Sequence, residues 1–213
     1  MTTNISHHIP DELMAAYVAG VLPKAFSLVV ATHISMCDEC RANLHAHEAA
    51  GGAVLDAIDT QALSEALRGS IFEQLDDGFD DTPAAPVRSG IYPGPVMEAL
   101  KGAGPKWKRL GGGVKQCILE MDKFGSSRLL YIPAGQAVPD HGHSGMELTL
   151  VLQGAFSDET GRFAVGDVEV ADTDLEHVPT AEEGLPCICL AATDAPLRFN
   201  AFIPRLLQPL FGI

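Results

Sequence analysis

The feature that most constrains this chain is the segment His33-Ile-Ser-Met-Cys37-Asp-Glu-Cys40, with the spacing H-x3-C-x2-C. The segment is expected to be helical. Residues three and four apart share a helix face, so its histidine and two cysteines would point the same way. Such groups converging on one point are the ligands that a structural zinc prefers, and His7 or His8 can supply the fourth. The alternative is a helix with a chance histidine and two buried small cysteines.

Residues 1–76 are predicted to form a small helical bundle of three to four helices. Pro10 followed by Asp11 and Glu12 is a helix-start signal, because acidic residues stabilise the positive end of the helix dipole. Further helices are expected over about 24–34, 39–57 and 60–75, although the two glycines at 51–52 weaken the third. So thin a core would gain from a zinc ion that pins the N-terminal arm to the second helix, which favours a structural metal.

The second half of the chain has a different texture. Residues 77–92 have the acidic, proline- and glycine-rich composition of a linker. From residue 93 to 204, short β-type runs punctuated by glycine and proline predict a sandwich or small barrel, and residues 205–213 would form a C-terminal tail. The predicted fold class is therefore α + β and multidomain. The candidate strands are 107–110, 114–121, 127–132, 146–153, 155–158, 168–171, 186–192 and 197–202.

A second group of metal-ligand residues lies between Gly135 and Gly154, where the pattern is G-x5-H-x-H-x3-E-x6-G. His141 and His143 project to one face of an extended backbone, and Glu147 follows at the start of the next strand. Together they form a half-site for a divalent metal, and His177 is available as a further ligand. The alternative is a set of surface histidines on a generic β-sandwich.

This pattern resembles the first motif of the cupin superfamily, gap for gap. The resemblance implies a jelly-roll β-barrel whose mouth holds a metal on three histidines and one glutamate, here His141, His143, Glu147 and His177. The second cupin motif, G-x5-P-x-G-x2-H-x3-N, is matched less well. Asp172, Asp174 and Ala181 stand at its Pro, Gly and Asn positions.

Two further cysteines, Cys187 and Cys189, lie two apart on a predicted strand and so face the same side. Neighbours of this kind are poorly placed for a mutual disulfide. They are either two small core residues or a soft-ligand, redox-sensitive pair near the cupin metal. Five unevenly spread cysteines do not form a disulfide framework, and in a reducing compartment they indicate metal ligands or buried thiols.

The N-terminal half resembles zinc-binding anti-sigma domains, in which an upstream His or Cys precedes H-x3-C-x2-C on a helix. The upstream ligand would be His8, with His7 as the alternative. Fused to a cupin, this domain resembles the ChrR family of anti-sigma factors. The resemblance implies two zinc sites and a partner, a sigma factor of the extracytoplasmic-function type. It also implies that the cupin is needed for release under singlet-oxygen or related oxidative stress.

Charge and hydrophobic pattern agree with such a partner. Residues 1–76 hold ten acidic and three basic residues, a net charge of −7 that suits a basic protein surface. An apolar stripe is a candidate anchor for binding in a groove, although simple core packing explains it equally well. The stripe comprises Leu63, Leu67, Ile71 and Leu75, with Phe72 beside it.

The total formal charge of −14 argues against direct binding to nucleic acid or an anionic membrane. No run of eighteen apolar residues and no signal pattern occur, so we expect a cytoplasmic protein.

Three functions compete. A regulator with redox-inert zinc and no catalytic residues is favoured. A metal-dependent cupin enzyme, a dioxygenase or isomerase with a helical oligomerisation arm, is the alternative. A stand-alone small-molecule-binding cupin is the third.

The route of the signal can also be predicted. In some zinc anti-sigma factors an oxidant joins zinc-ligand cysteines, usually including one on the N-terminal arm. This arm has histidines and no cysteine. We therefore expect the signal to enter through the cupin metal site, or through Cys187 and Cys189.

Overall fold

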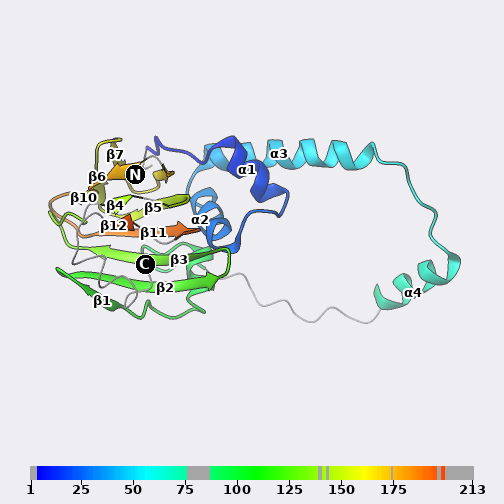
Figure 1. Ribbon diagram of the computed structural model, residues 1–213. Coiled ribbons are helices and arrows are strands. Elements are labelled where there is room, and N and C mark those ends of the chain that lie inside the picture. Colours follow the sequence, from blue (N-terminus) through cyan, green and yellow to red (C-terminus); the bar gives the residue numbers. More distant parts are fainter. Residues whose placement is uncertain are drawn as a thin grey trace.

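Helices precede strands along the chain in the computed structural model, which describes residues 4–75, 87–138, 141–142, 144–173, 175–195 and 198–199 (Figure 1). Of residues 141, 198 and 199 only the backbone is described. None of the described helices is both long enough and apolar enough to cross a membrane. The helices are α1 (Asp11–Val18), α2 (Lys24–Ile34), α3 (Asp38–Asp56), α4 (Glu65–Leu75) and α5 (Gly94–Ala99).

The first four helices follow the local signals in the sequence, but α4 begins at Glu65 and not near residue 60, so Leu63 lies before the helix. α1 begins directly after Pro10 and α2 directly after Pro23, so each proline fixes the backbone just before the helix. Gly20, at φ +70°, follows α1, because a glycine takes this left-handed conformation without strain. α3 continues through Gly51 and Gly52. The six-residue α5 was not predicted, since it is shorter than a periodic pattern can reveal.

The metal motif does not lie on one continuous helix, and that prediction was wrong. α2 ends at Ile34, and Cys37 is the N-cap of α3 with an extended backbone at φ −114° and ψ 113°. The Cys37 sulfur accepts a hydrogen bond from the backbone N–H of Cys40, which caps the new helix. The ligands therefore converge across a helix–turn–helix corner.

All named strand pairs are antiparallel, and they form three sheets that close into a barrel-like body (Figure 1). The six-stranded sheet has the order β1-β2-β3-β11-β5-β8, and the smaller sheets have the orders β10-β6-β7 and β12-β4-β9. The strands are β1 (Lys108–Gly111), β2 (Val114–Asp122), β3 (Gly125–Ile132), β4 (His141–Gly142), β5 (Glu147–Gln153), β6 (Ala155–Ser157), β7 (Arg162–Ala164), β8 (Val168–Ala171), β9 (Glu176–His177), β10 (Thr180–Ala181), β11 (Cys187–Thr193) and β12 (Arg198–Phe199).

Each of the eight predicted strands overlaps an observed one, and the α + β fold class is confirmed. β4, β7, β9 and β10 were not predicted, because two or three residues carry no alternation that a sequence pattern can reveal. The expected strand over residues 197–202 is described only at Arg198–Phe199, and the expected tail over 205–213 lies outside the described residues.

The central strands of the six-stranded sheet are buried on both faces, and the apolar residues of each face belong to a different core. Along β5, Leu148 and Leu150 pack toward the helices, whereas Val151 packs into the barrel interior with Cys187. Six consecutive residues of β5 and of β11 are therefore buried. This two-sided burial explains why β11 is a continuous run of apolar residues, whereas in β5 the buried polar residues Glu147 and Thr149 alternate with leucines.

The N-terminal helices complete their core with the barrel sheet. Val29 and Val30 of α2 and Met14 of α1 are fully buried in one cluster with Leu150 and other sheet residues. Figure 1 shows α2 alongside the sheet, with α3 extending away from it. The thin helical core expected from the sequence is thus thickened by the second half of the chain.

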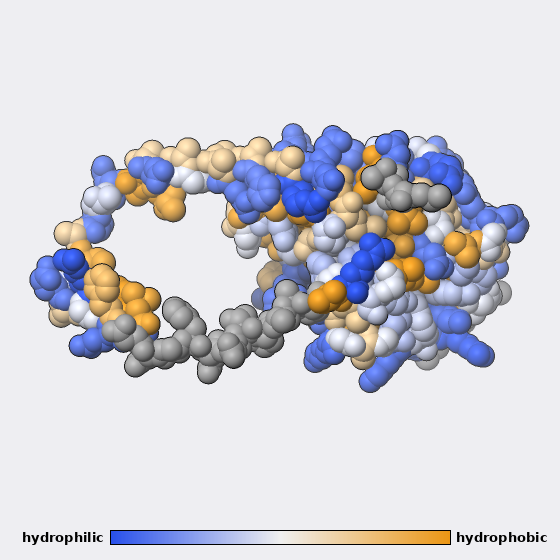
Figure 2. Space-filling view, turned by 180° about the vertical axis from the view of Figure 1, so that it is seen from behind, coloured by the Kyte–Doolittle hydropathy of each residue, from blue (hydrophilic) through white to orange (hydrophobic). Residues whose placement is uncertain are grey.

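The far end of α3 and the whole of α4 lie apart from this core. No residue of α4 is buried, and Figure 2 shows apolar atoms gathered on α4 and near the end of α3. The large apolar side chains exposed there are Val54, Leu55, Ile58, Leu63, Leu67, Ile71, Phe72 and Leu75.

Candidate metal centres

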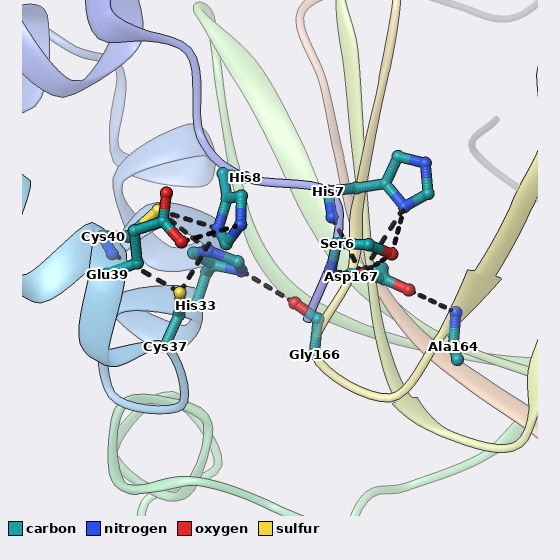
Figure 3. A network of polar contacts seen from close by, with 10 residues as sticks. All are labelled: Ser6, His7, His8, His33, Cys37, Glu39, Cys40, Ala164, Gly166 and Asp167. Atoms are coloured by element: carbon teal, nitrogen blue, oxygen red, sulfur yellow. Dashed lines mark hydrogen bonds and ion pairs between the residues drawn. The ribbon is translucent and has the colours of Figure 1, made fainter. Parts of the chain in front are cut away.

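Four ligand-type side chains from three segments meet beside the end of α2 (Figure 3). His8 comes from the arm before α1, His33 from the last turn of α2, Cys37 from the N-cap of α3 and Cys40 from its first turn. One ligand atom from each lies within 4.8 Å of all the others.

The spacing of these atoms fits a tetrahedral zinc ion. His8 Nδ1 is 3.4 Å from the Cys37 sulfur and 3.6 Å from the Cys40 sulfur, and His33 Nε2 is 3.2 Å from the Cys40 sulfur. Zinc bonds of about 2.0–2.3 Å place neighbouring ligand atoms about 3.3–3.8 Å apart. Two thiols and two imidazoles are also a donor set that structural zinc sites use.

Of the two adjacent histidines, the structure brings only His8 to this cluster. The His7 ring turns to the barrel, where its Nδ1 lies 3.5 Å from Asp167 and its ring centroid 4.4 Å from that of Phe163. The second ring nitrogen of His8, Nε2, lies 3.4 Å from a carboxylate oxygen of Glu39. His8 therefore meets the cysteines with one nitrogen and an acidic partner with the other.

Burial sets the protonation of the cluster. It lowers the pKa of His33 to about 4, so the imidazole is neutral at pH 7, as a metal ligand must be. Burial raises the pKa of Cys40 to about 11. A buried thiol of this kind becomes a thiolate when a cation such as zinc binds it, and the N-terminus of α3 favours the same charge.

The cluster is attached to the barrel by the turn between β7 and β8 (Figure 3). His33 Nδ1 donates a hydrogen bond of 2.8 Å to the Gly166 carbonyl. Asp167 accepts hydrogen bonds from the backbone N–H groups of Ser6 and His7, at 2.7 and 3.0 Å. Sequence reasoning did not single out Asp167, although Gly166 is the first glycine of the second cupin motif.

In the barrel, His177 is fully buried and faces two carboxylates. Its Nδ1 lies 2.6 Å from Asp158 Oδ2 and 3.3 Å from Glu169 Oε1. Glu147 is also buried, and one of its oxygens accepts a hydrogen bond from the Thr149 hydroxyl. Backbone pairing places residue 141 opposite His177, between β4 and β9. The His141 side chain and all of His143 lie outside the described residues.

Asp158, Glu169 and His177 form a strongly coupled buried group. Burial raises the pKa of Glu169 to about 7. Burial lowers the pKa of His177, but the two carboxylates outweigh it and raise that pKa to about 9. The pKa of Asp158 falls, because hydrogen bonds from Glu169, Thr160 and His177 outweigh its burial. The three groups can hold a cation, or the carboxylates can orient His177 for a metal on its other nitrogen.

The second cysteine pair lies in the barrel interior. Cys187 and Cys189 are both buried, and their sulfurs are 3.4 Å apart, a contact distance rather than a bond. The hydrogen bond with Cys187, together with burial, raises the pKa of Cys189 well above its ordinary value. Both cysteines pack in the interior core. The negative charges of Glu169 and Glu147 are close enough to Cys189 to help raise the pKa of its thiol.

The apolar stripe predicted on the fourth helix is exposed. Its five side chains, Leu63, Leu67, Ile71, Phe72 and Leu75, are between 42% and 57% accessible. Packing of this stripe into the core of the described chain, the simpler of its two explanations, is therefore not observed.

Comparison with known proteins places these features in context. The chain is 54% identical over 216 residues to the anti-sigma-E factor ChrR of Cereibacter sphaeroides, covering 98% of this chain and 99% of that protein. It resembles a chain in the crystal structure of Rhodobacter sphaeroides SigE in complex with the anti-sigma ChrR. That match has 53% identity and a TM-score of 0.79, and it covers 90% of this chain and all of that one. Residues 99–195 match the family described as the ChrR cupin-like domain.

Proposed function

The chain belongs to the ChrR family of anti-sigma factors, and we propose that it binds and inhibits an extracytoplasmic-function-type sigma factor through residues 1–76. The observation that carries this proposal is the near-full-length match to a chain seen in complex with SigE. The relative is a regulator and not an enzyme, so no catalytic role is assigned to the barrel. Because the sigma factor is a partner of RNA polymerase, a protein that binds it is expected to be cytoplasmic.

The surface that supports sigma binding is the exposed apolar face of α4 and the end of α3. Apolar side chains on an exposed helix, such as Leu67 and Ile71, can anchor in a hydrophobic groove of a partner. The net charge of −7 over residues 1–76 complements the basic surfaces of a sigma factor.

Zinc on His8, His33, Cys37 and Cys40 would give this half its shape. These residues join the arm, the end of α2 and the start of α3, so a bound ion would fix the direction in which α3 leaves the barrel. The ion supplies Lewis-acid attraction for two thiolates and two imidazoles, with no open position for chemistry. Its role would be structural.

Co-purification tests this function. The full chain is co-expressed with an extracytoplasmic-function sigma factor from the same genome, and complex recovery is measured with and without a zinc chelator. The matched variant is Cys37→Ser/Cys40→Ser, and Cys117→Ser on β2 is the control. We expect a stable complex with the wild type and the control, and loss of the complex with the chelator or the double variant. Absence of any complex with the wild type would refute the function.

For the barrel, we propose a second zinc on His141, His143, Glu147 and His177, and a role in releasing the sigma factor under singlet-oxygen or related oxidative stress. Glu147 and His177 are both buried in the barrel, and β4 places residue 141 opposite His177. Cys187 and Cys189 are a second route for the signal, since their sulfurs are in contact near Glu147 and Glu169.

The entry point of the signal is tested with sigma-dependent reporter expression after oxidant exposure. His177→Ala and Cys187→Ser/Cys189→Ser are compared with the wild type. We expect at least one to repress normally without oxidant and to lose induction with it. Full induction in both would exclude the barrel as the entry point.

A further inference from the structure

The β7–β8 turn of the barrel contacts His33 of the N-terminal metal cluster and also the arm residues directly before His8. A carbonyl oxygen only accepts, so the His33 ring must donate from Nδ1 to the Gly166 carbonyl at 2.8 Å. The proton is then on Nδ1, and the lone pair of Nε2 faces the Cys40 sulfur at 3.2 Å. This is the tautomer that binds a metal through Nε2.

Asp167 holds the arm immediately before His8. Its Oδ1 accepts hydrogen bonds from the backbone N–H groups of Ser6 and His7, and its Oδ2 accepts one from Ala164 within the turn. The N–H of Val168 donates to the His7 carbonyl at 3.2 Å. Asp167 is only 2% exposed, so its carboxylate is committed to these bonds and shielded from water.

The arm packs closely on this turn at Gly166, where the Ile5 side chain occupies the space that a side chain would need. A Cβ built there would lie 2.6 Å from the end of the Ile5 side chain, and φ of +96° independently favours glycine. The arm is therefore seated on the turn by side-chain packing as well as by hydrogen bonds.

We propose that the β7–β8 turn is the outer shell of the N-terminal metal site, with Asp167 as the positioning residue for His8 and the Gly166 carbonyl orienting His33. This rests on the proposed function only in requiring that the cluster binds a metal. Outer-shell partners fix the direction of ligand side chains, and their loss typically weakens metal affinity about 10–100-fold. The barrel thus helps to build the metal site of the sigma-binding half.

The strand that follows this turn, β8, contributes to the buried group inside the barrel. Glu169 is on β8, two residues after Asp167 in the chain. Its carboxylate lies 3.3 Å from the Nδ1 of His177. A shift of β8 caused by a change around His177 would move the anchor of the arm, which gives the barrel a short mechanical path to His8 and His33.

Cobalt binding to the full-length protein tests the proposal. Co²⁺ bound by thiolates gives a sulfur-to-metal charge-transfer band, and its loss in Cys37→Ser/Cys40→Ser would assign the band to the N-terminal site. Affinity is measured by competition with a chelator. We expect Asp167→Ala to weaken cobalt binding there about 10–100-fold. Glu120→Ala, which removes an exposed carboxylate from β2, should leave it unchanged.

The conservative variant separates positioning from general stability. Asp167→Asn keeps one oxygen acceptor, so we expect it to restore part of the lost affinity. Trp107 fluorescence monitors folding of the barrel in every variant. If Asp167→Ala does not fold, the test is made with Asp167→Asn alone, for which we expect a several-fold loss of cobalt affinity. Folded Asp167 variants with wild-type cobalt affinity would overturn the proposal. Absence of the band in the wild type would instead refute the metal site itself.

Discussion

At the scale of single residues, the adjacent pair His7 and His8 shows how extended backbone divides two identical side chains between different tasks. The arm runs beside β8, and successive side chains of an extended segment point to opposite sides. His7 therefore packs against Phe163 with tilted rings, while His8 faces Cys37 and Cys40. Composition cannot distinguish the two histidines, but the pairing register of the arm does.

Alanine substitutions at these two adjacent histidines form a matched pair of variants. We expect His8→Ala to weaken metal binding at the N-terminal site by more than the roughly 10–100-fold cost of an outer-shell loss, because a ligand itself is removed. His7→Ala keeps the backbone N–H that donates a hydrogen bond to Asp167, so cobalt affinity should stay within a few-fold of the wild type. Chelator competition on both variants measures this. Equal losses of cobalt affinity in the two variants would contradict the assignment of His8, rather than His7, as the metal ligand.

At the scale of elements, α2 and α4 are opposite cases of helices that local signals predict well. α2 is buried on nearly every side, whereas α4 has no buried residue. Hydrophobic periodicity predicts that each helix has an apolar face but does not say what covers it. For α2 the cover is the barrel sheet, and for α4 we propose that it is the sigma factor.

The exposure of α4 predicts that binding and stability separate there. Ile71→Asp should reduce recovery of the sigma factor complex at least tenfold, because it places a charge in the proposed apolar contact. It should change the free energy of unfolding of the isolated chain by no more than about 0.5 kcal/mol, as expected for a surface site. Pull-down and urea denaturation measure the two effects, and Ser70→Asp is the control. A large loss of stability would show that the stripe packs within the chain.

At the scale of the whole molecule, helices α1 and α2 and the barrel share one apolar core. Val29 and Val30 of α2 pack in the same cluster as Leu150 and Leu190 of the sheet. Elements that bury one another's apolar surface are expected to unfold together.

Two spectroscopic probes test this cooperation in the metal-loaded protein. The single tryptophan, Trp107, lies in the barrel half with its ring centroid 6.0 Å from that of Tyr131, so its fluorescence reports on the barrel. Far-ultraviolet circular dichroism at the helix band reports mainly on the helices. We expect the two probes to give coincident thermal transitions. Val30→Ala should lower both transition temperatures together, because it reduces the free energy of unfolding by roughly 2 kcal/mol. Two separated transitions would show that the halves unfold independently.

The sequence by itself determined the local features of this protein. Ligand chemistry and spacing indicated His33, Cys37 and Cys40. Pro10 with the acidic residues after it indicated the start of α1, and apolar runs indicated the longer strands. Each of these features depends on residues that are only a few positions apart, so it can be recognised in the sequence alone. The cupin resemblance likewise came from one compact motif.

The tertiary structure alone decided which distant segments meet. It selected His8, bent the metal motif at Cys37, covered α2 with the sheet and placed Asp167 under an arm 161 positions away in the sequence. Such contacts depend on how the sheet closes and on which polar groups burial forces to pair. No local pattern carries that information, because a buried aspartate and an exposed one have the same letter in a sequence.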